Sequence, residues 1–95
     1  MITSIADVTT DAAPRYAKQL ASHLGRKAPV EELTDGGFRL TLGSGEGVLE
    51  PQADRLLMRA TAPDRESLAV VQDVLGRHLE RFGQRNELTV TWADS

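Results

Sequence analysis

Two histidines, His23 and His78, carry the most versatile side chains of this 95-residue sequence. An imidazole changes its charge near neutral pH, so it can act as a general base or bind an anion. Both histidines fall near the C-terminal end of a predicted helix, where the helix dipole favours the protonated form. His23 borders the apolar stripe of its helix and His78 lies within that of the second, so a half-buried histidine with one hydrogen-bond partner is the alternative interpretation.

Basic and phenolic side chains around these histidines complete an anion site if the two helices pack side by side. On this interpretation the ligand-binding residues are Tyr16, His23, Lys27, His78 and Arg81. Cations at helix ends also complement the helix dipoles, which requires no ligand. A further interpretation makes His23 or His78 the general base of a small enzyme, which requires a cleft around it.

The number and spacing of cysteine, histidine and carboxylate residues in the sequence predict neither a metal site nor covalent catalysis. The chain has no cysteine, which excludes a thiolate nucleophile and a cysteine-based zinc site. A zinc site needs three or four ligands, and neither histidine has a second histidine or a carboxylate at ligand spacing. The glycine-rich residues 43–47 lack the Lys-Ser/Thr ending of a phosphate loop. We therefore assign no catalytic residue and predict neither a metal nor a cofactor.

Composition limits the class of protein. A chain of 95 residues predicts one domain, spanning residues 1–95. The net charge of −3 argues against nucleic-acid binding, which requires a basic face. No apolar run approaches the roughly 18 residues that span a bilayer, so we predict no membrane contact. The N-terminus lacks the features of a signal peptide, and we expect a cytoplasmic protein.

Alternation and turn residues predict a strand over residues 4–9 and then a helix that ends near Leu24. Thr10 or Asp11 supplies the N-cap of this helix, and Gly25 follows it in the left-handed conformation. Short strands are predicted next, at residues 30–34, 38–42, 48–50 and 56–62. Residues 35–37 form a hairpin turn between the first two of these strands, and residues 43–47 form a loop.

The second helix is the stronger amphipath. Asp64 caps its start, and Gly83 stops it. Gly76 lies inside it at a cost of about 1 kcal/mol relative to alanine, which close packing would explain. A polar turn and a final strand follow, in which Leu88, Val90 and Trp92 alternate with threonines.

The element order β-α-β-β-β-β-α-β, with short connections, predicts a mostly antiparallel, curved sheet. Each helix has one apolar stripe to bury, so both must cover the same face, which gives a two-layer α+β sandwich. Arg39 and Arg59 point away from the helices and provide an alternative anion site on the open face. That face, or an edge strand, is also where the chain could self-associate as a homodimer, although exposed arginine and threonine are ordinary on a solvated sheet.

These residues resemble a small bacterial family, domain of unknown function 2218, over most of the chain. The resemblance rests on Arg15-Tyr16, on His23-Leu24-Gly25-Arg26-Lys27, and on His78-Leu79-Glu80-Arg81-Phe82 followed by a strand that ends at Trp92. The first histidine block of the family reads His-aromatic-x-His-Lys. Here Leu24 and Arg26 replace the aromatic residue and the second histidine, which weakens any metal site built from that block.

The resemblance implies a TATA-binding-protein-like α+β fold and a context in siderophore and iron metabolism. Members of the family occur alone, or fused or adjacent to siderophore-interacting flavin reductases, which release iron from ferric siderophores. The resemblance implies no catalytic residue. We therefore expect a binding or accessory module whose partner is such a reductase or an anionic small molecule.

Overall fold

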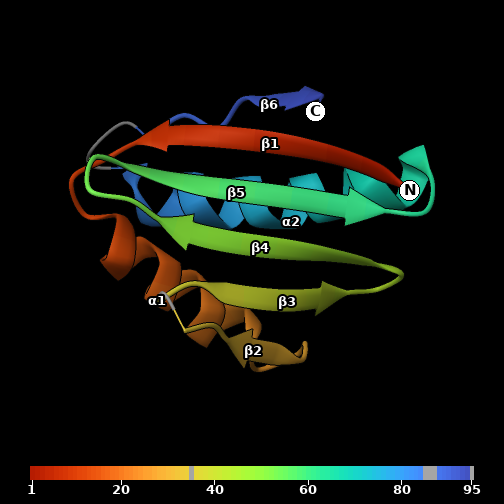
Figure 1. Ribbon diagram of the computed structural model, residues 1–95, viewed down its shortest axis with the longest axis horizontal. Coiled ribbons are helices and arrows are strands. Elements are labelled where there is room, and N and C mark those ends of the chain that lie inside the picture. The colour runs from red at the N-terminus through yellow and green to blue at the C-terminus, as the bar shows by residue number, and fades with distance from the viewer. Residues whose placement is uncertain (35, 85–87, 95) are drawn as a thin grey trace.

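One six-stranded antiparallel sheet carries two helices on one of its faces (Figure 1). The computed structural model describes residues 1–34, 36–84 and 88–94. The strands lie in the order β2-β3-β4-β5-β1-β6, and every neighbouring pair is antiparallel. The predicted two-layer α+β sandwich is therefore confirmed. The elements are β1 (Ile2–Thr9), α1 (Ala13–Leu24), β2 (Val30–Glu32), β3 (Phe38–Leu42), β4 (Gly45–Pro51), β5 (Arg55–Ala62), α2 (Arg65–Phe82) and β6 (Trp92–Asp94).

The core fills the space between the helices and the central strands. On β5, Leu56, Met58 and Ala60 are fully buried against the helices, while Arg59 between them is exposed. Both helices pack over β4 and β5, α1 extends over β3, and α2 extends over β1. The period-two pattern of the sequence thus assigned the strand faces correctly, because successive side chains of a strand alternate between the face buried under the helices and the face exposed to solvent.

Two glycines on β4 let α2 approach the sheet closely. A Cβ atom at Gly47 would lie 2.6 Å from Leu75 Cδ1, and one at Gly45 would lie 2.7 Å from Val71 Cγ2. A side chain at Gly45 would also meet the backbone oxygen of Thr61 at 2.8 Å, and one at Gly47 would have to displace the buried Leu75 side chain. The prediction of a loop over residues 43–47 was wrong for residues 45–47. Gly45 and Gly47 belong to strand β4, where they allow α2 to pack closely on the sheet. Only Gly43 and Ser44 form the hairpin turn, and Gly43 has the positive φ of 64° that such turns require.

Helix α1 ends at Leu24 as predicted, but both predicted caps need correction. Ala12 takes the N-cap position without a side-chain bond, and the Thr10 hydroxyl accepts a hydrogen bond from the Ala12 N–H at 3.1 Å. Gly25 has a right-handed conformation, with φ −63° and ψ −13°, rather than a left-handed one. The chain continues in helix-like turns, in which the N–H groups of Lys27 and Ala28 donate to the Leu24 carbonyl.

The C-terminal segment pairs with the sheet over a shorter stretch than predicted. Strand β6 begins at Trp92 and pairs with residues 4–6 of β1, so residues 88–91 are not a strand. Val90 and Trp92 still pack on the core. The predicted polar turn after Gly83 falls mostly on residues 85–87, and part of the predicted hairpin turn falls on residue 35, both outside the described residues.

The contact between β4 and α2 yields a prediction for Gly45→Ala. The new methyl group would meet Val71 Cγ2 at 2.7 Å and the Thr61 carbonyl oxygen at 2.8 Å, and the backbone atom cannot move away cheaply. We expect the free energy of unfolding to fall by about 1–3 kcal/mol, as for other overpacked cores. Urea denaturation of both proteins measures the difference.

Gly76→Ala is the matched control. A Cβ atom there would contact Trp92 Nε1 at 3.4 Å and Val90 Cγ1 at 3.5 Å, which are ordinary van der Waals distances. Because alanine favours the helix by about 1 kcal/mol over glycine, this variant should be more stable than the natural chain. If both alanine variants changed stability alike, the steric account of Gly45 would be wrong.

The confirmed N-cap of α2 gives a pH prediction. The Ser67 N–H donates to Asp64 Oδ1 at 2.7 Å, and the Ser67 backbone and hydroxyl together hold the pKa of this carboxyl below its ordinary value. The carboxylate therefore stabilises the fold above the unfolded pKa of about 3.9, and this contribution is lost as the pH falls through the lowered folded pKa. Asp64→Asn removes the titration.

We therefore expect the natural chain to exceed Asp64→Asn in the free energy of unfolding at about pH 6, with the difference shrinking toward about pH 3. Urea denaturation across this range provides the measurement. A stability difference independent of pH would contradict the assigned cause.

Candidate functional site

A hollow of about 760 Å³ opens where the C-terminal end of α1, the middle of α2 and the β3–β4 turn meet. Its polar and basic lining includes His23, Arg26, Lys27 and His78. Three of these are residues of the predicted ligand site. His23 and His78 come from two helices and are 55 positions apart in the chain, and Lys27 lies in the turn after α1. The packing of both helices on one sheet face brings them together.

The two imidazoles lie close to each other beside a phenyl ring. The ring centroids of His23 and His78 are 5.1 Å apart, with an angle of 47° between the ring planes. The Phe82 ring packs edge-on against His23 at 5.4 Å. His23 is exposed and His78 is half-buried. A cluster of this kind offers aromatic edges and two titratable nitrogens to whatever enters the hollow.

One hydrogen bond determines the tautomer of His78. Its Nδ1 lies 2.6 Å from the Val74 carbonyl oxygen, one turn earlier in α2. Because a carbonyl oxygen only accepts, Nδ1 must carry the hydrogen and donate it. Neutral His78 therefore keeps Nε2 as an acceptor, and protonation would turn Nε2 into a second donor.

The cations at the end of α1 have no carboxylate partner among the described residues. No ion pair within residues 1–34, 36–84 and 88–94 engages Arg26 or Lys27. The C-terminal end of a helix is itself a partial negative charge, which opposes an anion. Here the carbonyls of Ala21 and Leu24 already accept hydrogen bonds from Gly25, Lys27 and Ala28. The positive charges of Arg26 and Lys27 consequently outweigh the partial negative charge of these carbonyls in the electrostatic potential at the end of α1.

The remaining two residues of the predicted ligand site lie elsewhere. Tyr16 is 6% exposed and belongs to the hydrophobic core. Arg81 is exposed in the last turn of α2 and does not line the hollow. Arg26 and Thr41 line it instead, and neither was among the predicted ligand residues. Arg26 could have been predicted as a site residue because it is adjacent to Lys27 in the sequence. Thr41 lies on β3, and only the fold shows that it lines the hollow.

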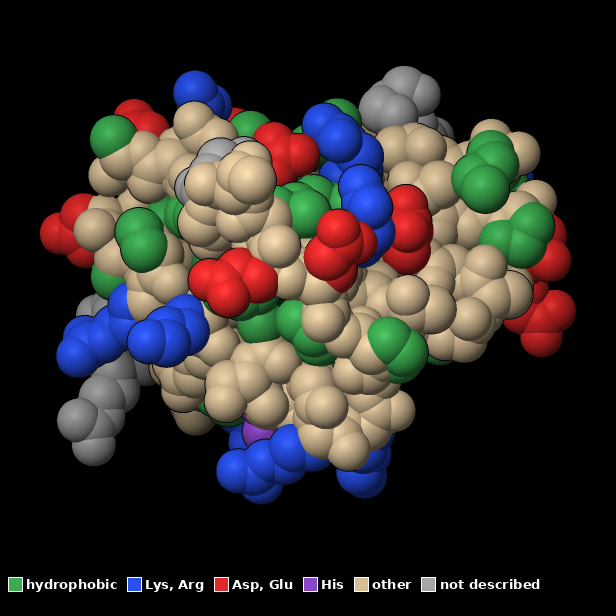
Figure 2. Space-filling view, turned by 60° about the horizontal axis from the view of Figure 1, so that its bottom comes forward, with side chains coloured by type: hydrophobic (Ala, Val, Ile, Leu, Met, Phe, Trp, Pro, Cys, Tyr) green, Lys and Arg blue, Asp and Glu red, His purple; other side chains and the backbone are tan. Residues whose placement is uncertain are grey.

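The alternative arginine site on the open face of the sheet is occupied by acidic neighbours. Arg39 lies 3.3 Å from Glu31 and 3.9 Å from Glu46, and Arg59 lies 3.4 Å from Glu50. Such exposed pairs stabilise the fold by about 0–1 kcal/mol, but they cancel each other's charge at a distance. Figure 2 shows acidic and basic side chains next to one another on the upper surface and histidine among basic side chains at the lower edge. The charge pattern thus favours the hollow over the sheet face.

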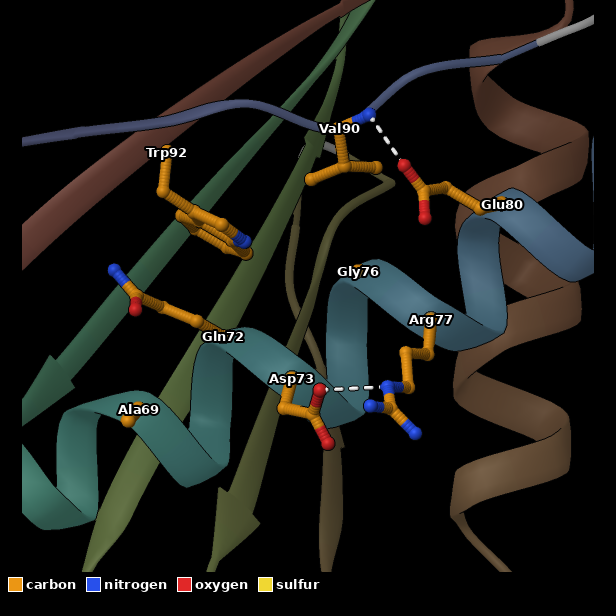
Figure 3. A pocket seen from close by; sticks show the side chains of 8 residues that line it. All are labelled: Ala69, Gln72, Asp73, Gly76, Arg77, Glu80, Val90 and Trp92. Atoms are coloured by element: carbon orange, nitrogen blue, oxygen red, sulfur yellow. Dashed lines mark hydrogen bonds and ion pairs between the residues drawn. The ribbon is translucent and has the colours of Figure 1, made fainter.

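A smaller hollow of about 350 Å³ lies between α2 and the C-terminal segment (Figure 3). Its charged groups are engaged within it. Asp73 pairs with Arg77 at 2.7 Å, and Glu80 accepts a hydrogen bond from the Val90 N–H at 3.0 Å. The Glu80–Val90 hydrogen bond holds the C-terminal segment against α2, and the Asp73–Arg77 pair lies within the helix, so we regard this hollow as structural.

The described residues contain no group of three or more histidine, aspartate or glutamate side chains arranged to hold a metal ion. Within the same part of the chain, neither helix is long and apolar enough to cross a membrane. The side chains that line the hollow include two imidazoles, two cations and several apolar groups.

The fold and the site define a two-layer α+β domain with a basic hollow between the end of α1 and the middle of α2. The chain belongs to the bacterial family described as "uncharacterized protein conserved in bacteria" (DUF2218), which matches residues 5–93. It is also similar to PA4090 from Pseudomonas aeruginosa, whose structure was determined by NMR. That likeness has 32% sequence identity and a TM-score of 0.82, and it covers 98% of this chain and 96% of the other. No curated protein matches the chain.

The hydrogen bond from His78 to Val74 gives a prediction for NMR. In the neutral form, His78 should carry its proton on Nδ1. Long-range proton–nitrogen spectra recorded at alkaline pH distinguish the two tautomers, and His23 in the same sample serves as the comparison. A neutral His78 with its proton on Nε2 would remove the donor from this hydrogen bond.

Proposed function

We propose that the chain is a binding module that takes an anionic small molecule into the hollow between α1 and α2. The observation that carries the proposal is the His23–His78 pair, 5.1 Å apart, beside two cations without a described carboxylate partner. Imidazolium, guanidinium and ammonium groups all donate charge-assisted hydrogen bonds to anions. Acidic side chains are absent from the described lining, so nothing there repels such a ligand.

Binding accounts for these residues better than catalysis does. A general base needs a nucleophile or an acid to work with, and among the described lining residues the Thr41 hydroxyl and the Lys27 ammonium are the candidates, since no carboxylate, serine or cysteine lines the hollow. His78 already uses Nδ1 to bond its own helix. Its second nitrogen is suited to contact a ligand, without a partner that would relay a proton.

The cellular context we propose is the handling of siderophore-bound iron, with the chain acting as an accessory module. Family members found beside siderophore-interacting flavin reductases support this context. Siderophores that carry carboxylate groups are anionic, which matches the cations at the end of α1. Such a reductase is the protein partner we propose.

An amide-resolved NMR titration of the full chain with ferric and iron-free carboxylate siderophores tests the proposal. We expect saturable shifts at His23, Lys27 and His78. Lys27→Gln should weaken binding by about threefold to tenfold, because a cation near an anionic ligand contributes roughly 1 kcal/mol at an exposed site. The diamagnetic gallium complex replaces the ferric one where paramagnetic broadening hides signals.

Lys18→Gln is the matched control, since Lys18 is the other lysine of the chain and does not line this hollow. It should bind as the natural chain does. Equal losses in both lysine variants would indicate general charge attraction rather than a site. Saturable shifts around Arg39 and Arg59 would move the site to the sheet, and no shift at millimolar ligand would favour contact with a protein.

A further inference from the structure

The hollow has a second, apolar wall, and one of its residues is unusually exposed. Val70 on α2 is 52% exposed. Among the described residues, the other large hydrophobic side chains exposed to a comparable extent or more are Met1 and Val30. The core stripe of α2 runs through Val71, Leu75 and their neighbours, so Val70 lies outside the surface that folding itself buries.

Val70 also has apolar neighbours across the hollow. Val74 follows it by one helical turn and lines the same space, and Leu42 and Pro29 line it from the β3 side. Arg26 and Lys27 line the hollow just after the end of α1. One ligand in this space would therefore meet apolar side chains and two cations together.

We infer that the ligand of this hollow is an amphiphilic carboxylate, in which an anionic group is attached to an apolar body such as a ring. This inference rests on the proposed function and specifies the class of molecule for the same site. The carboxylate contacts Arg26, whose planar guanidinium matches it with two parallel hydrogen bonds, and Lys27 adds a point charge. The apolar body covers Val70 and Val74.

The histidine pair favours the same class of ligand. Imidazole rings stack on flat apolar surfaces and donate hydrogen bonds from their edges. A small hydrated anion such as phosphate would bind the cations but would leave the Val70 side chain exposed to solvent. A ring carboxylate uses both walls, and removing the apolar surface from water adds affinity in proportion to the area covered.

Benzoate, acetate and inorganic phosphate are the probes that test this inference, each titrated into the full chain and followed by amide NMR. We expect benzoate to bind about tenfold or more tightly than acetate, because the two share the carboxylate and differ in the buried ring. Val70→Ser should weaken benzoate binding by about threefold to tenfold and leave phosphate binding unchanged. The exposure of Val70 makes this a variant that keeps the fold.

Val30→Ser is the matched control, because Val30 is an exposed valine that does not line this hollow. It should leave benzoate binding unchanged. Acetate or phosphate binding as tightly as benzoate at the hollow would overturn the amphiphilic class while leaving the proposed anion site intact. Benzoate binding insensitive to Val70→Ser would also overturn it. No saturable shift with any probe would overturn both the inference and the anion site.

Discussion

The close approach of α2 to β4 is the constraint on which the rest of this structure depends. Gly45 and Gly47 present bare backbone to Val71 and Leu75, so the helix axis can lie nearer the sheet than side chains would allow. The depth of α2 determines where its later residues lie. On this helix His78 lies with its ring centroid 5.1 Å from that of His23 on α1, and both line the hollow.

The electrostatics of the hollow depend on how α1 ends. A left-handed glycine cap would turn the chain away at once, whereas the right-handed Gly25 carries it through further turns. These turns satisfy the last carbonyls of the helix with backbone donors and place Arg26 and Lys27 at the rim. The unfavourable end of the helix dipole is thereby reduced where an anion would approach. On the sheet face the same residue types pair with acids and present little net charge.

Much of the architecture could be predicted from the sequence, and the failures have physical causes. Period-two alternation placed β5 and β3 correctly, and the acidic cap at Asp64 marked the start of α2. The glycines at 45 and 47 were misassigned to a loop, because glycine marks both a turn and a close approach to a neighbouring element. Which of the two applies depends on α2, more than 20 residues later in the chain.

The sequence by itself determined the element order, the wet and dry faces of the strands, the family and the candidate histidines, because these follow from local pattern and residue type. Only the tertiary structure decided that the imidazoles lie 5.1 Å apart, that Tyr16 is buried in the core, and that Val70 lines the same hollow as Arg26 and Lys27. Those distances depend on how deeply two helices sit on a sheet. That depth comes from packing between residues far apart in the chain, which no local pattern encodes.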